Sequence, residues 1–562
     1  MDDLDLDYEK RHAEYYLNKL DTLNKQYILG GDQVGEALQN FDIEIGQIEA
    51  AQRWACVNAE QDDQAAQTLE DFADWGADLL LLRFSPAKFE GWILAALAAA
   101  QRLRLRRAEC VHSGNLGIVR RQLGQVESAE QALQTALNIA RELNERELES
   151  LWRGNLGNVY LAQNQYESAR QELTLALEIA IEQQDDRKSG NWFGNLGTVF
   201  ARQEDFQSAV TVYLQALEKH QKVGDRRSEA YTYDNLGNVL SALGQMQKAV
   251  TCHQRALALG EALGDQRIVA NANGNLGITL SQLGVYEQAI THHDKAWTIF
   301  KQLGDVHEQL VELHHLADTL KTVGDYNASF ACFEALLESS RNLDNAVYEL
   351  KALTGIGVIL RIHHFLEDAE RTHRQALALA KLLTDKASEH QQYGYLGVVL
   401  FEMGQYKDAI AYYEKGMAIA RELGDKMSVG QHLGNIGNAH NMINLPEKAI
   451  EYLQEALAIA EELQHTRTIG ALSGNLGNSY RLLQQYTKSI TYYQLALQVA
   501  EKIGDRLNVG NWHNNLGVVF AANKQPEEAK SHYEQALAVF RDLQIEHMVQ
   551  SVLRNMEITL EG

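Results

Sequence analysis

The sequence is poor in the residues that stop helices and in those that form covalent cross-links. It has three prolines and four cysteines in 562 residues. A low proline content is typical of an all-helical protein, because proline inside a helix removes a hydrogen bond and clashes with the preceding turn. The cysteines are scattered and form no CxxC pair, which predicts reduced and mostly packed thiols rather than a disulfide framework. They are Cys56, Cys110, Cys252 and Cys332.

The sequence also lacks a surplus of positive charge and a long apolar run. Its formal net charge of -25 argues against binding a nucleic acid backbone and against docking on an anionic membrane. The longest apolar run, residues 92–100, is too short to cross a bilayer, so no membrane insertion is predicted. Three of the first five residues are aspartate, the reverse of the basic start of a signal peptide. We therefore predict a cytoplasmic protein that has no nucleic acid partner.

What the sequence has in abundance is a repeat of 40 residues. Ten glycines share this period, five of them within Gly-Asn-Leu-Gly and the others within close variants of it, and Ala317 takes the one missing position. The register is unbroken from residue 117 to residue 517, which predicts a solenoid of stacked repeats with an extended surface for macromolecules. The ten periodic glycines, for which we predict a structural role, are Gly117, Gly157, Gly197, Gly237, Gly277, Gly357, Gly397, Gly437, Gly477 and Gly517.

Each repeat is predicted to hold two helices. In residues 225–264, Asp225 can cap the first helix, and Gly244 follows that helix where a left-handed conformation is needed. The second helix is expected from about Met246 until Gly264. A glycine inside a helix costs roughly 1 kcal/mol relative to alanine, so we expect the periodic glycine to permit close contact. Small residues of the second helix, such as Ala249 and Ala256, would face it.

The order Leu-Gly-x-x-[Tyr/Phe], then Ala, an aromatic residue and Ala resembles the tetratricopeptide repeat. One repeat shows it as Leu196-Gly197, Phe200, Ala209, Tyr213 and Ala216. The resemblance covers about residues 110–549, eleven repeats, although the period departs from the usual 34. It implies an all-α fold, a right-handed α-solenoid superhelix of stacked antiparallel helix pairs. Repeats of this length are similar to those of the Partner-of-Inscuteable scaffold proteins and of bacterial signalling regulators. They imply a non-enzymatic scaffold or adaptor for protein–protein interaction.

Other segments flank the array. Residues 67–109 are predicted to be a degenerate capping repeat, and residues 550–562 end a C-terminal capping helix, which favours a monomer. Residues 1–66 are expected to form two helices, about 5–28 and 32–58, split by Gly30-Gly31. The N-terminal segment resembles helices that join the ATPase half of bacterial signal-transduction ATPases to their repeat arm. An alternative function is therefore a sensor or regulatory arm that acts with a separate ATPase, protease or transcription module. The divergent repeat 310–349 has either drifted or become specialised.

No motif in the sequence predicts catalysis. The Gly-Asn-Leu-Gly units lie inside predicted helices without a preceding strand, so they are not phosphate-binding loops. Histidine doublets, such as His314-His315, point about 100° apart on a helix and do not chelate a metal together. No serine–histidine–acid or cysteine–histidine arrangement is present. We predict no catalytic residues, no cofactor and no metal.

The resemblance implies that the first helix of each repeat supplies the inner face of the array. The positions concerned lie six and three before the periodic glycine, and one, four and five after it. Six cations stand there against three acids, Asp234, Asp318 and Glu402, although the whole chain is strongly acidic. We therefore predict a groove for an extended or helical peptide carrying acidic residues, because asparagine can hold a peptide backbone and arginine a carboxylate. Glycines three positions before, such as Gly154, serve either packing or the groove. The predicted binding residues are Arg121, Asn158, Asn191, Arg202, Asp234, Asn238, Asn271, Asp318, Lys321, Lys351, Arg361, Asn438, Asn478, Arg481, Asn511 and Asn514.

Overall fold

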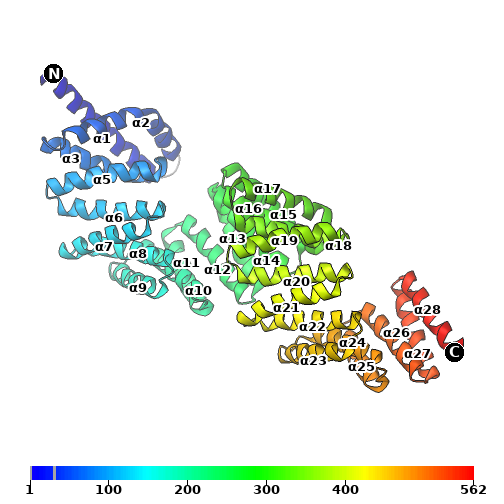
Figure 1. The fold of residues 1–562 in the computed structure, drawn as a ribbon. Helices are drawn as coiled ribbons and strands as arrows, with labels where there is room; N and C mark the ends of the chain where they lie inside the picture. Colours follow the sequence, from blue (N-terminus) through cyan, green and yellow to red (C-terminus); the bar gives the residue numbers. More distant parts are fainter. Residues whose placement is uncertain (1–2, 30–32, 562) are drawn as a thin grey trace. The chain divides into compact units, whose positions relative to one another are not determined.

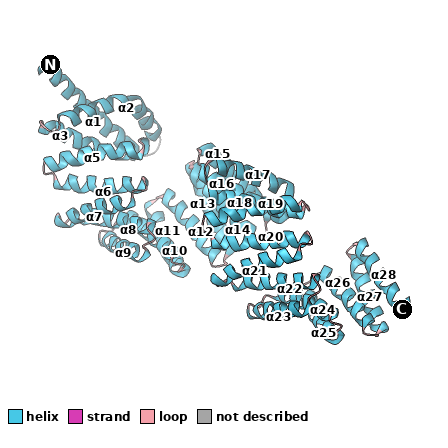
Figure 2. Ribbon diagram, in the orientation of Figure 1, coloured by secondary structure: helices cyan, strands magenta, loops and turns pink. Residues whose placement is uncertain are grey.

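A computed structural model describes residues 3–29 and 33–561 of the chain. These residues form 28 helices joined by short turns, with no strand among them (Figure 1 and Figure 2). Their contacts divide the chain into two compact units, residues 1–299 and 300–562. The all-α fold of stacked helix pairs is confirmed. Gly30-Gly31, at which the first two helices were expected to separate, lies outside the described residues.

The N-terminal helices share a core with the first repeat. Phe41, Phe72 and Trp92 are buried in one cluster with Leu116 of that repeat. The predicted pair of long helices is confirmed, whereas residues 63–102 hold three helices, the middle one short. The helices are α1 (Asp3–Leu29), α2 (Gln33–Asn58), α3 (Asp63–Trp75), α4 (Ala77–Arg83) and α5 (Pro86–Arg102).

The repeats of the first unit follow as helix pairs, and the two helices of a repeat pack closely against each other. The pairs are α6 (Arg106–Gln122) and α7 (Val126–Glu142), α8 (Arg146–Ala162) and α9 (Tyr166–Glu182), α10 (Asp186–Arg202) and α11 (Phe206–Val223), α12 (Arg226–Ala242) and α13 (Met246–Leu263), and α14 (Gln266–Gln282) and α15 (Tyr286–Leu303).

The second unit repeats the same pattern and ends on a single helix. The pairs are α16 (Val306–Val323) and α17 (Tyr326–Asn342), α18 (Ala346–Ile362) and α19 (Leu366–Leu382), α20 (Lys386–Glu402) and α21 (Tyr406–Glu422), α22 (Lys426–Met442) and α23 (Pro446–Glu462), α24 (Thr466–Leu482) and α25 (Tyr486–Lys502), and α26 (Arg506–Ala522) and α27 (Pro526–Asp542). The last helix, α28 (Glu546–Glu561), packs on α27.

The turns repeat at half the period of the sequence. A left-handed residue follows the helices every 20 residues from Arg104 to Gln544. Gly244 (φ +73°) and Gly264 (φ +66°) confirm the predicted helix ends. Non-glycine residues such as Glu204 and Lys524 take the same conformation, even though it is unfavourable for an L-residue. The turn geometry is therefore a property of the helix pair and not of glycine alone.

The predicted aspartate caps are also confirmed. The Asp225 carboxylate accepts a hydrogen bond from the Ser228 backbone N–H at 3.1 Å. Asp425 does the same for Ser428 at 3.0 Å. Each cap satisfies one of the backbone N–H groups that the first turn of a helix leaves unpaired.

The contact at the periodic glycine differs from the one predicted from the alanine rows. A Cβ at Gly117 would lie 3.1 Å from the Ala129 carbonyl oxygen, so the helices do approach closely. The nearest atoms, however, belong to a large side chain sixteen residues after the glycine. A Cβ at Gly397 would lie 2.4 Å from Cε1 of Tyr413, and one at Gly277 would lie 2.6 Å from Cε1 of His293. The glycine therefore makes room chiefly for a ring, and the facing alanines are only part of the contact.

Candidate protein-binding surface

In the first unit, the first helices of successive repeats contact each other. α8 touches α10, α10 touches α12, and α12 touches α14. In the described part of the chain, successive second helices such as α9 and α11 make no more than marginal contact. Because the first helices lie closer together, they occupy the inner side of each curved stack. We refer to the solvent-facing side of these helices as the inner face.

Glycine three positions before the periodic glycine allows the first helices to approach. A Cβ at Gly114 would lie 2.4 Å from the Trp152 ring, and one at Gly154 would lie 2.2 Å from the Trp192 ring. Both glycines are buried. The indole Nε1 of Trp192 donates to Ser150 Oγ at 3.2 Å. Of the two roles considered for these glycines, packing between repeats is therefore the one that the contacts support.

The predicted binding residues of the first unit are distributed over successive first helices, and no hydrogen bond joins them to each other. Arg202 is exposed at the end of α10, and Arg121 is half-buried at the end of α6. Neither has a carboxylate partner among the described residues. The amide side chains of four asparagines likewise make no hydrogen bond within the described ranges 3–29 and 33–561, and so can pair with a ligand. These are Asn158, Asn191, Asn238 and Asn271.

Asp234 is occupied inside the protein. Its carboxylate is buried, and it lies 2.8 Å from His253 Nδ1 and accepts a hydrogen bond from Asn275 Nδ2 at 2.8 Å. These contacts connect α12, α13 and α14. Because both carboxylate oxygens are used, we leave Asp234 out of the proposed binding surface.

Two predicted cations of the second unit are neutralised by neighbouring acids. Lys321 forms an ion pair with Asp318, another predicted binding residue. Arg361 pairs with Glu402 of the next first helix at 2.6 Å. Lys351 lies 4.7 Å from the centre of the Tyr348 ring. The local excess of positive charge counted from the sequence is therefore partly cancelled by contacts within the chain.

The remaining predicted residues of the second unit lie on α22, α24 and α26. Asn478 accepts a hydrogen bond from the Tyr493 hydroxyl at 2.6 Å. Burial raises the pKa of Tyr493, while the charge of nearby Arg481 opposes that rise. Asn514 accepts from Asn555 of α28 at 3.1 Å, and Asn511 donates to Asn508 at 3.2 Å. The amide of Asn438 makes no hydrogen bond among the described residues, which leaves it available to a ligand.

Sequence reasoning missed a set of buried histidines beneath the periodic glycines. His253, His293 and His373 occupy the position sixteen residues after the glycine, where other repeats carry tyrosine, leucine or phenylalanine. Burial lowers the pKa of His373 to about 4, so its ring is neutral near pH 7. The 40-residue period itself was the signal that could have found this set, because all three share one position.

The described residues contain no group of three His, Cys, Asp or Glu side chains arranged to hold a metal ion. None of the four cysteines forms a disulfide, and of the four only Cys110 is buried. Within residues 3–29 and 33–561, every helix is too short or too polar to span a bilayer.

The helix pairs and their periodic glycines match a known family. The family model of the tetratricopeptide repeat matches residues 107–182, 188–262, 228–302, 392–462 and 468–542, which is more than half of the chain. The chain belongs to the tetratricopeptide repeat family. This fold is generally a non-catalytic scaffold for protein interaction, and membership supports that role here. No curated protein matches the chain.

Several solved structures are similar to this tetratricopeptide repeat protein at low identity. BtubC from P. vanneervenii is 23% identical over 39% of this chain and 93% of its own, with a TM-score of 0.36. The quorum sensor NprR from B. thuringiensis is 13% identical over 64% and 99%, with a TM-score of 0.45. A signal-transduction ATPase with a tetratricopeptide repeat sensor, from Pyrococcus horikoshii, is 14% identical over 65% and 56%, with a TM-score of 0.46.

Proposed function

We propose that this protein is a cytoplasmic, monomeric scaffold that binds an acidic segment of a partner protein on the inner face of its repeats. The supporting observation is that Arg121 and Arg202 keep their positive charge unpaired among the described residues of an acidic chain. Guanidinium groups bind carboxylates bidentately. The unpaired amides of Asn158 and Asn191 would hold the backbone of the bound segment.

Reversing both charges tests this proposal. Arg121→Glu together with Arg202→Glu should weaken capture of an acidic partner about 10-fold or more per arginine, since a charge-assisted hydrogen bond contributes roughly 1.5–3 kcal/mol. The measurement is affinity capture from native lysate, followed by titration of each recovered protein at low and high salt. Lys407→Glu with Lys530→Glu is the matched control, because these exposed lysines lie on the second helices α21 and α27. Equal recovery by both double variants would count against the inner face.

A second candidate role is a regulatory arm whose N-terminal helices dock a separate ATPase, protease or transcription module. The observation that favours it is the exposure of large apolar side chains on α1 and α2. Ile43 is 76% exposed and Val57 is 79% exposed. Apolar side chains that form a contiguous patch facing solvent are typical of an interaction site.

Ile43→Glu with Val57→Glu should then abolish recovery of such a module while leaving partners of the inner face bound. The control is Leu382→Glu, since Leu382 on α19 has a matching exposure of 75%. If the α2 double variant and the control recover the same proteins as the wild type, the docking role is excluded. Deleting residues 1–66 is a poorer test, because their core is shared with Leu116.

A further inference from the structure

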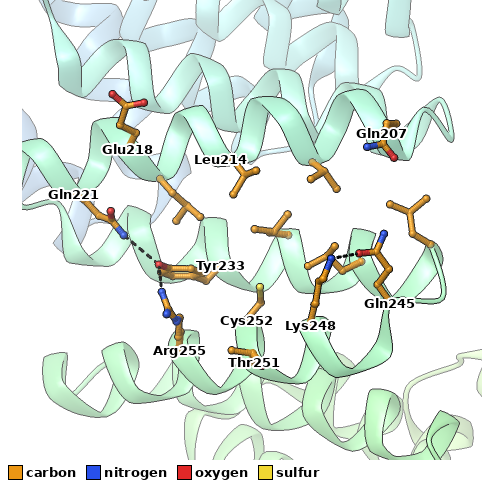
Figure 3. A pocket seen from close by; sticks show the side chains of 15 residues that line it. Gln207, Leu214, Glu218, Gln221, Tyr233, Gln245, Lys248, Thr251, Cys252 and Arg255 are labelled. Atoms are coloured by element: carbon orange, nitrogen blue, oxygen red, sulfur yellow. Dashed lines mark hydrogen bonds between the residues drawn. The ribbon is translucent and has the colours of Figure 1, made fainter.

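A cavity of about 670 Å³ lies between α11, α12 and α13 in the first unit (Figure 3). Its floor is formed by side chains of α12, including Leu236 and Leu240, which are buried. Leu214 of α11 and Cys252 of α13 point into it from opposite walls (Figure 3). Burial raises the pKa of Cys252, so this thiol stays uncharged and adds to the apolar lining. None of the inner-face residues lines the cavity.

Leu214 is the one apolar residue at its position in the eleven repeats. The side chain is 53% exposed, and at the equivalent position every other repeat carries a polar or charged residue. These residues are Gln134, Thr174, Gln254, Asp294, Glu334, Arg374, Glu414, Gln454, Gln494 and Glu534. The corresponding cavity among α17, α18 and α19 is accordingly polar, lined by Glu334 and Arg371. The other ten repeats pack with a polar residue at this position, so packing between repeats does not require leucine there.

The spacing of the lining residues is that of a helix-packing seam. On α12 and its C-terminal cap they are Tyr233, Leu236, Leu240 and Leu243, separated by three, four and three residues. On α11, Gln207, Val210, Leu214, Leu217 and Gln221 follow the same alternation. Side chains repeated at three and four residues form the stripe along which a second helix packs. The α11 seam spans about 21 Å at 1.5 Å per residue. The seams on α11 and α12 therefore line a trough along which a further helix can pack.

The charged residues at the rim of the trough indicate the charge expected on the helix that binds there. Lys248 and Arg255 stand on the α13 wall at opposite ends of the trough (Figure 3). Arg255 donates to the Tyr233 hydroxyl at 2.8 Å, and Gln221 donates to the same oxygen at 3.1 Å. The other wall carries one charge, Glu218. Because the two cations lie seven residues apart on one helix, they match acidic residues seven apart on a facing helix.

We propose that this trough is a second docking site, which takes the apolar face of an amphipathic helix from a partner protein, with acidic residues of that helix facing Lys248 and Arg255. The site is separate from the inner face and does not depend on the function proposed for it. Its apolar anchor is Leu214, with Val210, Leu243 and Cys252 completing the contact.

Two synthetic helical peptides of about 18 residues test the proposal by fluorescence anisotropy. Both carry leucine at the a and d positions of the heptad; one carries glutamate and the other lysine at e and g. The full-length protein should bind the glutamate peptide, and Leu214→Glu should weaken this binding at least 10-fold. Lys248→Glu with Arg255→Glu should reverse the preference between the two peptides.

Matched variants separate this site from the rest of the surface. Gln494→Glu introduces the same charge at the equivalent position of another repeat and should leave binding unchanged. The inner-face variant Arg121→Glu with Arg202→Glu should also bind normally, so the two proposals fail independently. Equal binding by Leu214→Glu and wild type overturns the proposal, as does equal affinity for the two peptides. Two further results would overturn it, because each would identify a different occupant of the trough. One is Leu214-dependent binding of dodecanoate without binding of the peptide, and the other is a dimer that Leu214→Glu dissociates.

Discussion

Replacing Trp152 by alanine is expected to lower the free energy of unfolding by about 3–5 kcal/mol. The indole is 1% exposed, and its Nε1 donates to Cys110 Sγ at 3.3 Å. Its ring lies against Gly114 of the preceding repeat, so the variant would leave a cavity between two first helices. In a stacked array each repeat depends on its neighbours, and the loss should therefore be concentrated in α6 and α8.

Hydrogen exchange measured by mass spectrometry can locate this effect. Peptides from α6 and α8 should exchange faster in Trp152→Ala, whereas those from α24 and α26 in the other unit should not change. Trp152→Leu should be milder, because Leu472 takes the equivalent position against Gly434. Unaltered exchange in α6 and α8, together with an unaltered urea midpoint, would contradict the packing role of the tryptophan.

Lowering the pH from 7 to 5 is expected to reduce the stability of the second unit by about 2 kcal/mol through His373 alone. Its Nδ1 lies 2.9 Å from Gln392 Oε1, which can only accept, so Nδ1 carries the proton. Nε2 is buried without a partner among the described residues. A second proton would place a charge on a buried ring, and burial lowers the pKa of His373 to about 4.

The sign follows from the unfolded state, in which histidine has a pKa of about 6.5. The unfolded chain takes up the proton first, so stability is complete above about pH 6.5 and is lost as the pH falls toward about 4. Urea unfolding of His373→Leu should show a smaller loss between pH 7 and 5; leucine already occupies this position as Leu133 and Leu453. Exposed His547 supplies the control, His547→Leu. If His373→Leu and wild type lose equal stability, the histidine is not the acid-sensitive group.

The helix ends show how far local sequence carries a prediction. Gly244, Gly264 and the cap at Asp225 were predicted because each residue type has a specific backbone preference. The left-handed turns at Arg104 and Glu204 were not, because neither residue favours that conformation. There the packing of the two flanking helices determines the turn, and local preference is overridden.

The sequence predicted which side chains lie on the candidate binding surface, but it did not predict which of them are left unpaired to bind a ligand. Family resemblance assigned Arg361 and Asp234 to the inner face. In the structure each is paired with a residue 41 positions later in the chain, Arg361 with Glu402 and Asp234 with Asn275. Arg202 has no such partner among the described residues. A motif places a side chain on a helix face, but its free charge depends on the neighbouring repeat.

By itself the sequence determined that helix pairs stack in register, because a 40-residue period returns the same side chain to the same contact in every repeat. It also determined where glycine is required. Only the tertiary structure decided that a ring or a leucine fills the space beside these glycines, which charges stay unpaired, and that Leu214 lines a trough. These properties depend on side chains from two or three helices at once, and their distances are set by packing rather than by the order of residues along the chain.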